Sequence, residues 1–365
     1  MGTYVTKQAN DSAADHDDAV VLPPASTTVE LKRSERYNIF PIRDKESWDF
    51  YTSQKTQMWD PCEIEFREDI RNFSRMKSRH QRLVRDLLAF FAPGDGIVIE
   101  MVDVFMTEAE NLEQEFFYKF QSANEATHAE GYGLCIKALF NEREQAEILR
   151  EVDTVPCVAA KAAFMEKYTD KKIPLGIRLI AGAASEGIFF VGLFTIIFYL
   201  RSLASTSDNS SCNLRSFIFL NEQVAKDEFL HRDFNIMRAR RLRDQYTREE
   251  AVGVLSEALN IEIEHIKYIL REPVESPEID AVKRITVENI SKYVAGLADQ
   301  IMVGLGFGTE FTTPVASIPG KYVEISLPWM NDMSLTKKTN FYEGKVASYR
   351  LSPHVGGDGD EQEFF

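Results

Sequence analysis

Two short motifs in the sequence combine a carboxylate and an imidazole at a spacing that suits metal binding. Glu125 and His128 lie in NEATHAEGY, and Glu228 and His231 lie in KDEFLHRDF. Residues three positions apart share one face of a helix, so each pair can bind the same ion. Carboxylate and imidazole ligands together suit iron, manganese or zinc.

A third pair with the same spacing, Glu262 and His265, lies in NIEIEHIKYIL. Its surroundings are acidic and amphipathic, which is typical of a solvated helix face. We therefore expect this pair to face solvent and exclude it from the metal ligands.

Two single acids stand in apolar surroundings, where a buried carboxylate is costly unless it is paired, protonated or bound to metal. Glu186 lies in AASEGIFFVGLF and Asp95 in FFAPGDGIV. Glu186 could be a first-turn acid near solvent, and Asp95 could be a solvated or capping residue at a Pro-Gly kink. Added to the two Glu-x-x-His pairs, they complete the ligand pattern of a dinuclear carboxylate bundle. Such a set can bridge two divalent ions and favours iron or manganese over structural zinc.

Aromatic and aliphatic side chains are spaced to surround such a centre. Tyr132 follows His128 by one helical turn, which would place a phenol beside the metals as a redox-active group. Phe190, Phe194 and Val224 could form a dry wall that protects a radical. Ordinary core packing explains the same spacing.

Long segments of helical periodicity must position these residues. Asp44 and Ser47 are plausible helix-start residues, and Pro93 should weaken or kink the second segment. We expect helices at about 78–106, 112–140, 156–168, 175–203, 213–243, 248–271 and 281–304. No series of strands with hairpin turns is visible, so the sequence predicts an all-α helical bundle.

The most apolar segment, GIFFVGLFTIIFYL at 187–200, has fourteen residues without a charge. A membrane span needs about 20. We therefore predict a central core helix and no membrane association.

Overall charge and cysteine content exclude several classes of protein. The net charge of −15 disfavours a nucleic-acid or anionic-lipid partner. GLGFG at 304–308 lacks the third glycine of a dinucleotide fingerprint. The four cysteines form no short pairing motif and the first residues contain no apolar signal segment, which together favour a reducing compartment, by default the cytoplasm.

The two ends of the chain differ in composition from the middle. Residues 1–35 are polar and contain Pro23-Pro24, so we expect a flexible arm before a bundle at 36–335. Residues 336–365 are rich in Gly and Asp and end in a Phe pair. That flexible tail is either a frayed end or a docking peptide for a partner protein.

The motifs together resemble one known family. MWDPCEIEF, LAFFAPGDGIVIE, FYKFQSANEATHAEGY, ASEGIFFVGLF, KDEFLH and PWMNDMSLTKKTNFYEGKVASY occur in the order and spacing of the small, radical-generating subunit of class I ribonucleotide reductase, of the eukaryotic or large-DNA-virus type. The resemblance covers about residues 48–350 and implies a ferritin-like dinuclear-metal bundle with additional helices, a homodimer, and a large catalytic subunit that binds the C-terminal tail.

The resemblance also implies roles for single residues. Tyr132 would carry the stable radical, and Trp59, Asp227 and Tyr349 would belong to the radical-transfer route to the large subunit, which reduces ribonucleoside diphosphates. The implied ligands of two iron ions, for which manganese could substitute, are Asp95, Glu125, His128, Glu186, Glu228 and His231.

Two departures from the family pattern bear on function. Lys226 replaces an Arg before the Asp-Glu pair, and the two cations differ in hydrogen-bond geometry. The chain ends in EFF in place of the usual acidic-Phe ending, which bears on the choice of partner.

Two other functions could use the same scaffold. A hydroxylase or desaturase would apply the metals to its own substrate and would not need Tyr349. Iron storage or a silent scaffold subunit would not need Trp59 or Tyr132.

Overall fold

The computed structural model describes residues 37–205, 207–274, 285–312 and 327–330. The chain divides into two units, Met1–Asn38 and Ile39–Phe365, and the description below concerns the second. The predicted arm at 1–35, the tail at 336–365 and Tyr349 lie outside the described residues.

The described part of the second unit consists of helices and their connections, with no strand in these ranges, and it confirms the all-α prediction. The α-helices are α2 (Lys45–Lys55), α3 (Arg67–Phe73), α4 (Ser78–Met106), α5 (Leu112–Leu139), α6 (Glu142–Leu149), α7 (Glu151–Thr154), α8 (Pro156–Lys167), α9 (Leu175–Ala184), α10 (Val191–Ala204), α11 (Arg215–Arg241), α12 (Arg248–Ile269) and α13 (Val287–Gly304). Short helical turns are η1 (Pro61–Glu63), η3 (Ser207–Cys212), η4 (Arg243–Gln245) and η6 (Pro328–Met330), and η2 (Ser185–Phe190) is a π-helical segment between α9 and α10.

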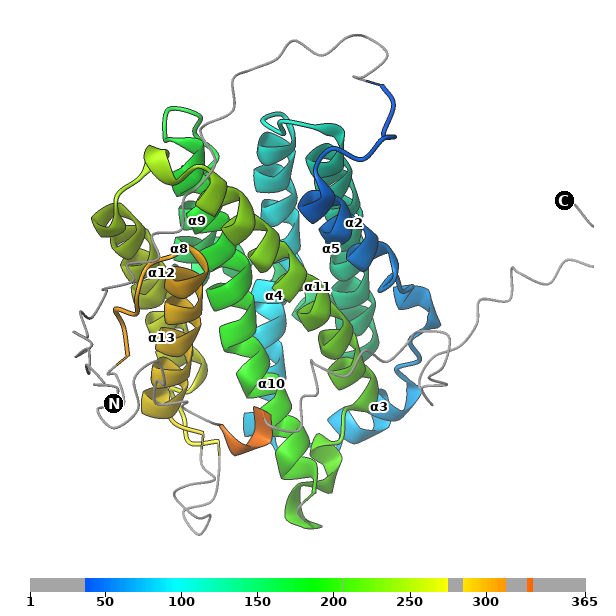
Figure 1. The fold of residues 1–365 in the computed structure, drawn as a ribbon. Coiled ribbons are helices and arrows are strands. Elements are labelled where there is room, and N and C mark those ends of the chain that lie inside the picture. Colours follow the sequence, from blue (N-terminus) through cyan, green and yellow to red (C-terminus); the bar gives the residue numbers. More distant parts are fainter. Residues whose placement is uncertain (1–36, 206, 275–284, 313–326, 331–365) are drawn as a thin grey trace, which may run out of the picture. The chain divides into compact units, whose positions relative to one another are not determined.

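The long helices form the bundle that carries the predicted ligands (Figure 1). Helix α4 packs along α5, α9 packs on α11, and α12 contacts α8, α9 and α13. α4 runs through Pro93 as one helix, so the proline does not end it as prolines often do. The ligand-bearing segments are neighbours, because α4 contacts α5, and α11 contacts both α5 and η2.

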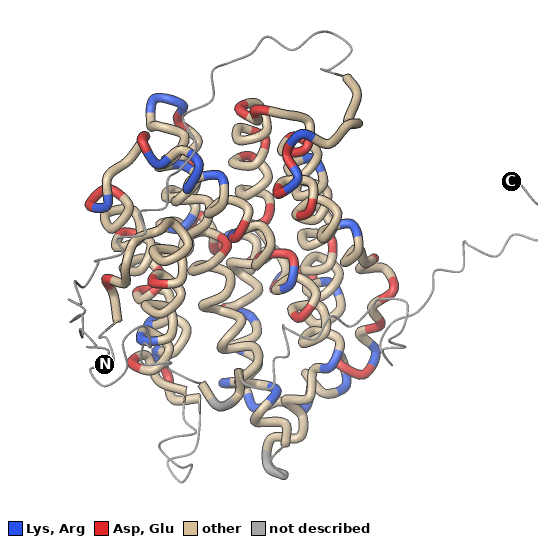
Figure 2. Tube along the Cα trace, in the orientation of Figure 1, with Lys and Arg blue, Asp and Glu red and all other residues tan. Residues whose placement is uncertain are grey.

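The helix that runs from α9 through η2 into α10 is the core of the bundle. Leu175–Ala204 is long and apolar enough to cross a membrane, but 83% of its most apolar window is buried inside the protein. Figure 2 shows that α10 carries almost no charged residue along its length. Burial by neighbouring helices explains its composition, as predicted for a core helix.

Capping side chains set where several helices begin. Thr247 and Glu250 form a capping box at α12, and Asn111 accepts the Gln114 N–H at the start of α5. These bonds satisfy backbone donors that have no partner within the helix. Asp44 is the N-cap of α2, as predicted, and accepts a bond from the Ser47 N–H.

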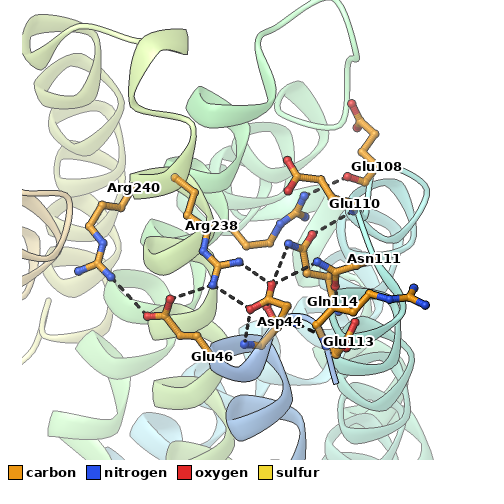
Figure 3. Close-up of polar contacts among 12 residues, drawn as sticks. Asp44, Glu46, Glu108, Glu110, Asn111, Glu113, Gln114, Arg238 and Arg240 are labelled. Carbon is orange, nitrogen blue, oxygen red and sulfur yellow. Dashed lines mark hydrogen bonds and ion pairs between the residues drawn. The ribbon is translucent and has the colours of Figure 1, made fainter. Parts of the chain in front are cut away.

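Asp44 is also the centre of a polar cluster that ties three helices together (Figure 3). The Arg241 guanidinium of α11 donates to both oxygens of Asp44, at 2.5 and 2.9 Å. Asn111 and Gln114, at the start of α5, donate to the same carboxylate. These bonds hold α2 against the ends of α5 and α11, because charge-assisted hydrogen bonds are among the strongest polar contacts.

Candidate metal centre

Six side chains converge between α4, α5, η2 and α11, and they are the six predicted ligands. One group consists of Asp95, Glu125, His128 and Glu228, and a second of Glu125, Glu186, Glu228 and His231. Within each group, one ligand atom per residue lies within 4.8 Å of all the others, and every member is buried.

Two of these acids, Glu125 and Glu228, belong to both groups. The Glu125 carboxylate lies 3.1 Å from His128 Nδ1 through Oε2 and 2.9 Å from His231 Nδ1 through Oε1. Glu228 likewise approaches His128 Nδ1 at 3.2 Å and His231 Nδ1 at 3.1 Å. Each group thus has one imidazole and one acid of its own and two acids in common, which is the arrangement that bridges a pair of divalent ions.

The chemistry of the donor set fits metal ions better than it fits a metal-free core. Both Asp95 oxygens and Glu186 Oε2 are buried without a hydrogen-bond partner. Buried polar atoms are normally satisfied, and a cation satisfies a carboxylate directly. The structure also excludes the alternatives of a solvated or capping Asp95, since Asp95 is completely buried in the interior of α4.

The pKa values of the centre report the same crowding of acids. Burial raises the pKa of Asp95 and of Glu186 well above the ordinary range, and nearby carboxylates raise both further. Burial opposes charge on His231, but Glu125 and Glu228 outweigh it and raise the pKa of His231 to about 9. Divalent ions would replace these protons as the counter-charge.

Trp59 reaches the centre through one carboxylate oxygen. Its indole Nε1 donates to Asp227 Oδ2 at 3.0 Å, and the same oxygen lies 3.1 Å from His128 Nε2. The Trp59 and His128 rings are nearly parallel, with centroids 5.9 Å apart. A carboxylate that holds the outer nitrogen of a ligand imidazole fixes the orientation of the ring.

Tyr132 lies inside the bundle with its hydroxyl bonded to a residue that the sequence analysis missed. The hydroxyl donates to Asn221 Oδ1 at 2.9 Å, and both side chains are fully buried. Burial raises the pKa of Tyr132 well above 10, with a further contribution from Asp95. The phenol is therefore neutral and dry.

The predicted apolar wall is present as packing. Phe91 stacks on Tyr132 with centroids 5.0 Å apart and on Phe194 with centroids 5.3 Å apart. Phe190 lies 5.9 Å from Phe91, and Val224 is fully buried. Together they keep water from the phenol.

A second missed residue connects the acids directly. Gln121 Nε2 donates to Glu186 Oε1 at 2.9 Å and to Glu125 Oε1 at 3.2 Å. Gln121 precedes Glu125 by one helical turn, and that spacing was the available signal. Asn221 precedes Glu228 by two turns, on the same face of α11.

The expectation that Glu262 and His265 face solvent is wrong. Both are completely buried, and Glu262 pairs with the Lys161 ammonium of α8 at 2.5 Å. The acidic character of the local sequence suggested exposure, but the partner that makes burial possible lies a hundred residues earlier. The pair does stand outside the two metal-binding groups, as expected.

Lys226, the departure next to Asp227, forms a hydrogen bond within its own helix. Its Nζ approaches Gln223 Oε1 at 3.4 Å on the same helix. Asp227 is oriented by Trp59 and His128 instead.

Comparison with known proteins agrees with this geometry. A model of the family "Ribonucleotide reductase, small chain" matches residues 36–319. The chain belongs to the ribonucleotide reductase small chain family. Members of this family are subunits of an oxidoreductase that works with a large subunit, and they have a ferritin-like fold and a dinuclear metal centre.

Individual relatives extend over most of the chain. The ribonucleoside-diphosphate reductase small chain of Nicotiana tabacum is 30% identical over 335 residues, covering 90% of this chain and 94% of its own. Subunit M2 of the enzyme from Homo sapiens is 31% identical over 318 residues, covering 86% of this chain and 75% of its own. The solved Rnr4 homodimer from Saccharomyces cerevisiae matches with a TM-score of 0.66 and 25% identity, covering 82% of this chain and 90% of that one.

Proposed function

We propose that this ribonucleotide reductase small subunit holds two iron ions and generates a radical on Tyr132 for use by the large subunit. The observation that carries the proposal is the pair of buried ligand groups with Glu125 and Glu228 in common. Two ferrous ions held there would let dioxygen oxidise the nearby phenol by one electron, with two further electrons from the ions and the fourth from an external reductant such as excess ferrous iron. The ligands are expected to be the six residues named above, and manganese has the same ligand preferences.

The residues around the ions prepare the phenol for one-electron oxidation. Phe91, Phe190 and Phe194 surround Tyr132 with apolar rings, so a radical there is protected from water and reductants. The bond to Asn221 fixes the orientation of the hydroxyl.

Trp59 and Asp227 are proposed to carry the radical outward. The carboxylate of Asp227 accepts the indole N–H and contacts His128, so it is placed to take the indole proton when Trp59 loses an electron. Tyr349 in the tail is the proposed next carrier, at the contact with the large subunit that reduces ribonucleoside diphosphates.

The proposed assembly is a homodimer whose C-terminal tails bind the large subunit, in the cytoplasm. The solved relative from Saccharomyces cerevisiae is a homodimer. All four cysteines of this chain are free thiols, which fits a reducing compartment.

Reconstitution tests the proposal directly. The protein is loaded with ferrous iron without oxygen, oxygen is admitted, and optical and electron paramagnetic resonance spectra are recorded. We expect two irons per chain and a tyrosyl radical, which Tyr132→Phe abolishes without loss of iron. A fully loaded protein that forms no radical would refute the proposal and favour an oxidase or storage function.

The docking role has its own test. Removal of the last ten residues should leave the radical intact and abolish nucleotide reduction with the large subunit. Unchanged reduction would reject the tail as the docking element.

Repeating the reconstitution with manganese in place of iron shows which metal supports the radical.

A further inference from the structure

A buried charged cluster outside the metal centre touches the segment that carries Glu186. Lys161 of α8 and Glu262 and His265 of α12 have no exposed surface. Lys161 Nζ lies 2.5 Å from Glu262 Oε2, and it also donates to the backbone carbonyl of Phe189 at 3.2 Å. Phe189 belongs to η2, three residues after Glu186.

The cluster is costly to bury. Moving two charges out of water costs more than a single contact usually returns, so a buried ion pair by itself is weak evidence of a gain in stability. Burial lowers the pKa of Lys161 and raises the pKa of Glu262 to about 7, in keeping with that cost. The cluster nevertheless fits in the core, because residue 192 is a glycine: a Cβ there would overlap Glu262 Oε1.

The buried cluster contacts the π-helical segment η2 through the bond from Lys161 to the Phe189 carbonyl. Single π turns are rare, occur mostly at functional sites, and lengthen the backbone hydrogen-bond ladder by one residue. One extra residue rotates the side chains on either side of it by about 100° relative to each other. In the π-helical geometry of η2, Glu186 accepts a hydrogen bond from Gln121 and lies 4.0 Å from His231 Nδ1.

We propose that Lys161 and Glu262 are positioning residues for Glu186: Glu262 holds the Lys161 ammonium in place, and the ammonium holds the Phe189 carbonyl and with it the π turn. The inference rests on the proposed metal-binding role of Glu186 and adds two residues that touch no ligand atom. An ammonium group in the cluster repels cations, so the cluster itself is no third metal site.

The test separates positioning from simple stabilisation with three variants. Lys161→Met removes the bond to Phe189 and leaves Glu262 without its partner, so both the melting temperature and metal binding should fall. Lys161→Met combined with Glu262→Leu replaces the pair by apolar groups, which is often neutral or stabilising. That double variant should have a melting temperature close to that of the wild type, although the Phe189 carbonyl no longer receives the hydrogen bond from Lys161 Nζ.

Arg178→Met is the matched control. Arg178 is as buried as Lys161, pairs with Glu108 and lies on α9, directly before η2. It should lower the melting temperature and leave metal binding unchanged, because Arg178 makes its bonds to Glu108 and to the Ile173 carbonyl, away from η2.

Two readouts complete the experiment. Anaerobic titration with Mn²⁺ measures the affinity of each metal position, and the double variant should bind one of the two ions about 10- to 100-fold more weakly, the usual effect of losing a group that orients a ligand. Hydrogen exchange of the metal-free protein should be faster in residues 185–194 of the double variant than in the wild type, and unchanged in α4.

A double variant that melts near the wild type, binds both ions with wild-type affinity and shows unchanged exchange in residues 185–194 would overturn the inference. A wild-type protein that fails to bind two ions would instead overturn the proposed function. The hydrogen-exchange comparison needs no metal and so still decides the role of Lys161 in that case.

Discussion

The hydrogen bond between Tyr132 and Asn221 is open to a quantitative test. The phenol donates to Asn221 Oδ1 at 2.9 Å. Asn221 Nδ2 donates in turn to the Phe217 carbonyl at 2.7 Å. Because that carbonyl can only accept, the amide nitrogen must face it and the amide oxygen must face the phenol.

The magnitude follows from burial. Tyr132→Phe keeps the ring stacked on Phe91 but leaves a buried amide oxygen without a donor, which costs about 1–3 kcal/mol. Asn221→Leu has similar volume and leaves the buried hydroxyl without an acceptor, at a similar cost. In the double variant neither group is left unpaired, so its cost should fall short of the sum by about 1–2 kcal/mol.

Urea unfolding of the metal-free wild type, both single variants and the double variant measures this coupling. Additive costs, within about 0.5 kcal/mol, would show that the two groups are not bonded in solution and would refute the argument. In reconstituted protein, a radical on Tyr132 has no hydrogen to donate and Asn221 presents an acceptor. The g values of the radical should therefore be the same with Asn221→Leu.

Three further perturbations have defined outcomes. Burial raises the pKa of Asp69 from 3.8 to about 6, so this group stabilises the fold most below about pH 4, and that stability is lost as the pH rises through about 6. The difference between these two pKa values corresponds to about 3 kcal/mol in the free energy of unfolding. Urea unfolding from pH 4 to 7 should therefore show a fall in the stability of the wild type that is missing in Asp69→Asn. Equal pH dependence in the two proteins would contradict this prediction. Asp44→Ala removes the cap of α2 and both bonds from Arg241, so thermal unfolding should show a loss of about 2–3 kcal/mol, and a loss below about 0.5 kcal/mol would reject the cluster as a tie between helices. Mn²⁺ at 100 times its dissociation constant should stabilise the protein by about 2.7 kcal/mol per occupied position; Glu125→Gln should abolish binding of both ions and Asp95→Asn of one, and equal stoichiometry in the two variants would contradict the shared ligation.

Much of the centre was predictable because helical periodicity is a local property. The three-residue spacing of Glu125 and His128, and of Glu228 and His231, places each pair on one face whatever surrounds it. The bounds expected for α4 and α5 agree with the structure within one residue.

The misses came from partners that are distant in sequence. Gln121 and Asn221 are neutral amides, and only their helical spacing from the predicted ligands marks them in the sequence. That spacing does not reveal Glu186 and Tyr132 as their partners. Glu262 was misassigned because its acidic neighbours suggested exposure, while Lys161 is supplied by another helix. The π turn was not predicted, since a segment that is apolar on every side has no periodicity to reveal one extra residue.

Because two acids belong to both ligand groups, the binding of one ion would affect the binding of the other. An ion in either position would hold Glu125 and Glu228 in their ligating orientation, so a second ion would meet two ligands that are already ordered. The first ion would thus lose affinity because it has to order the site, and the second ion would bind more favourably to a site that is already ordered. The fraction of subunits able to form a radical should therefore rise steeply over a narrow range of free metal, and half-loaded chains should be scarce on either side of it.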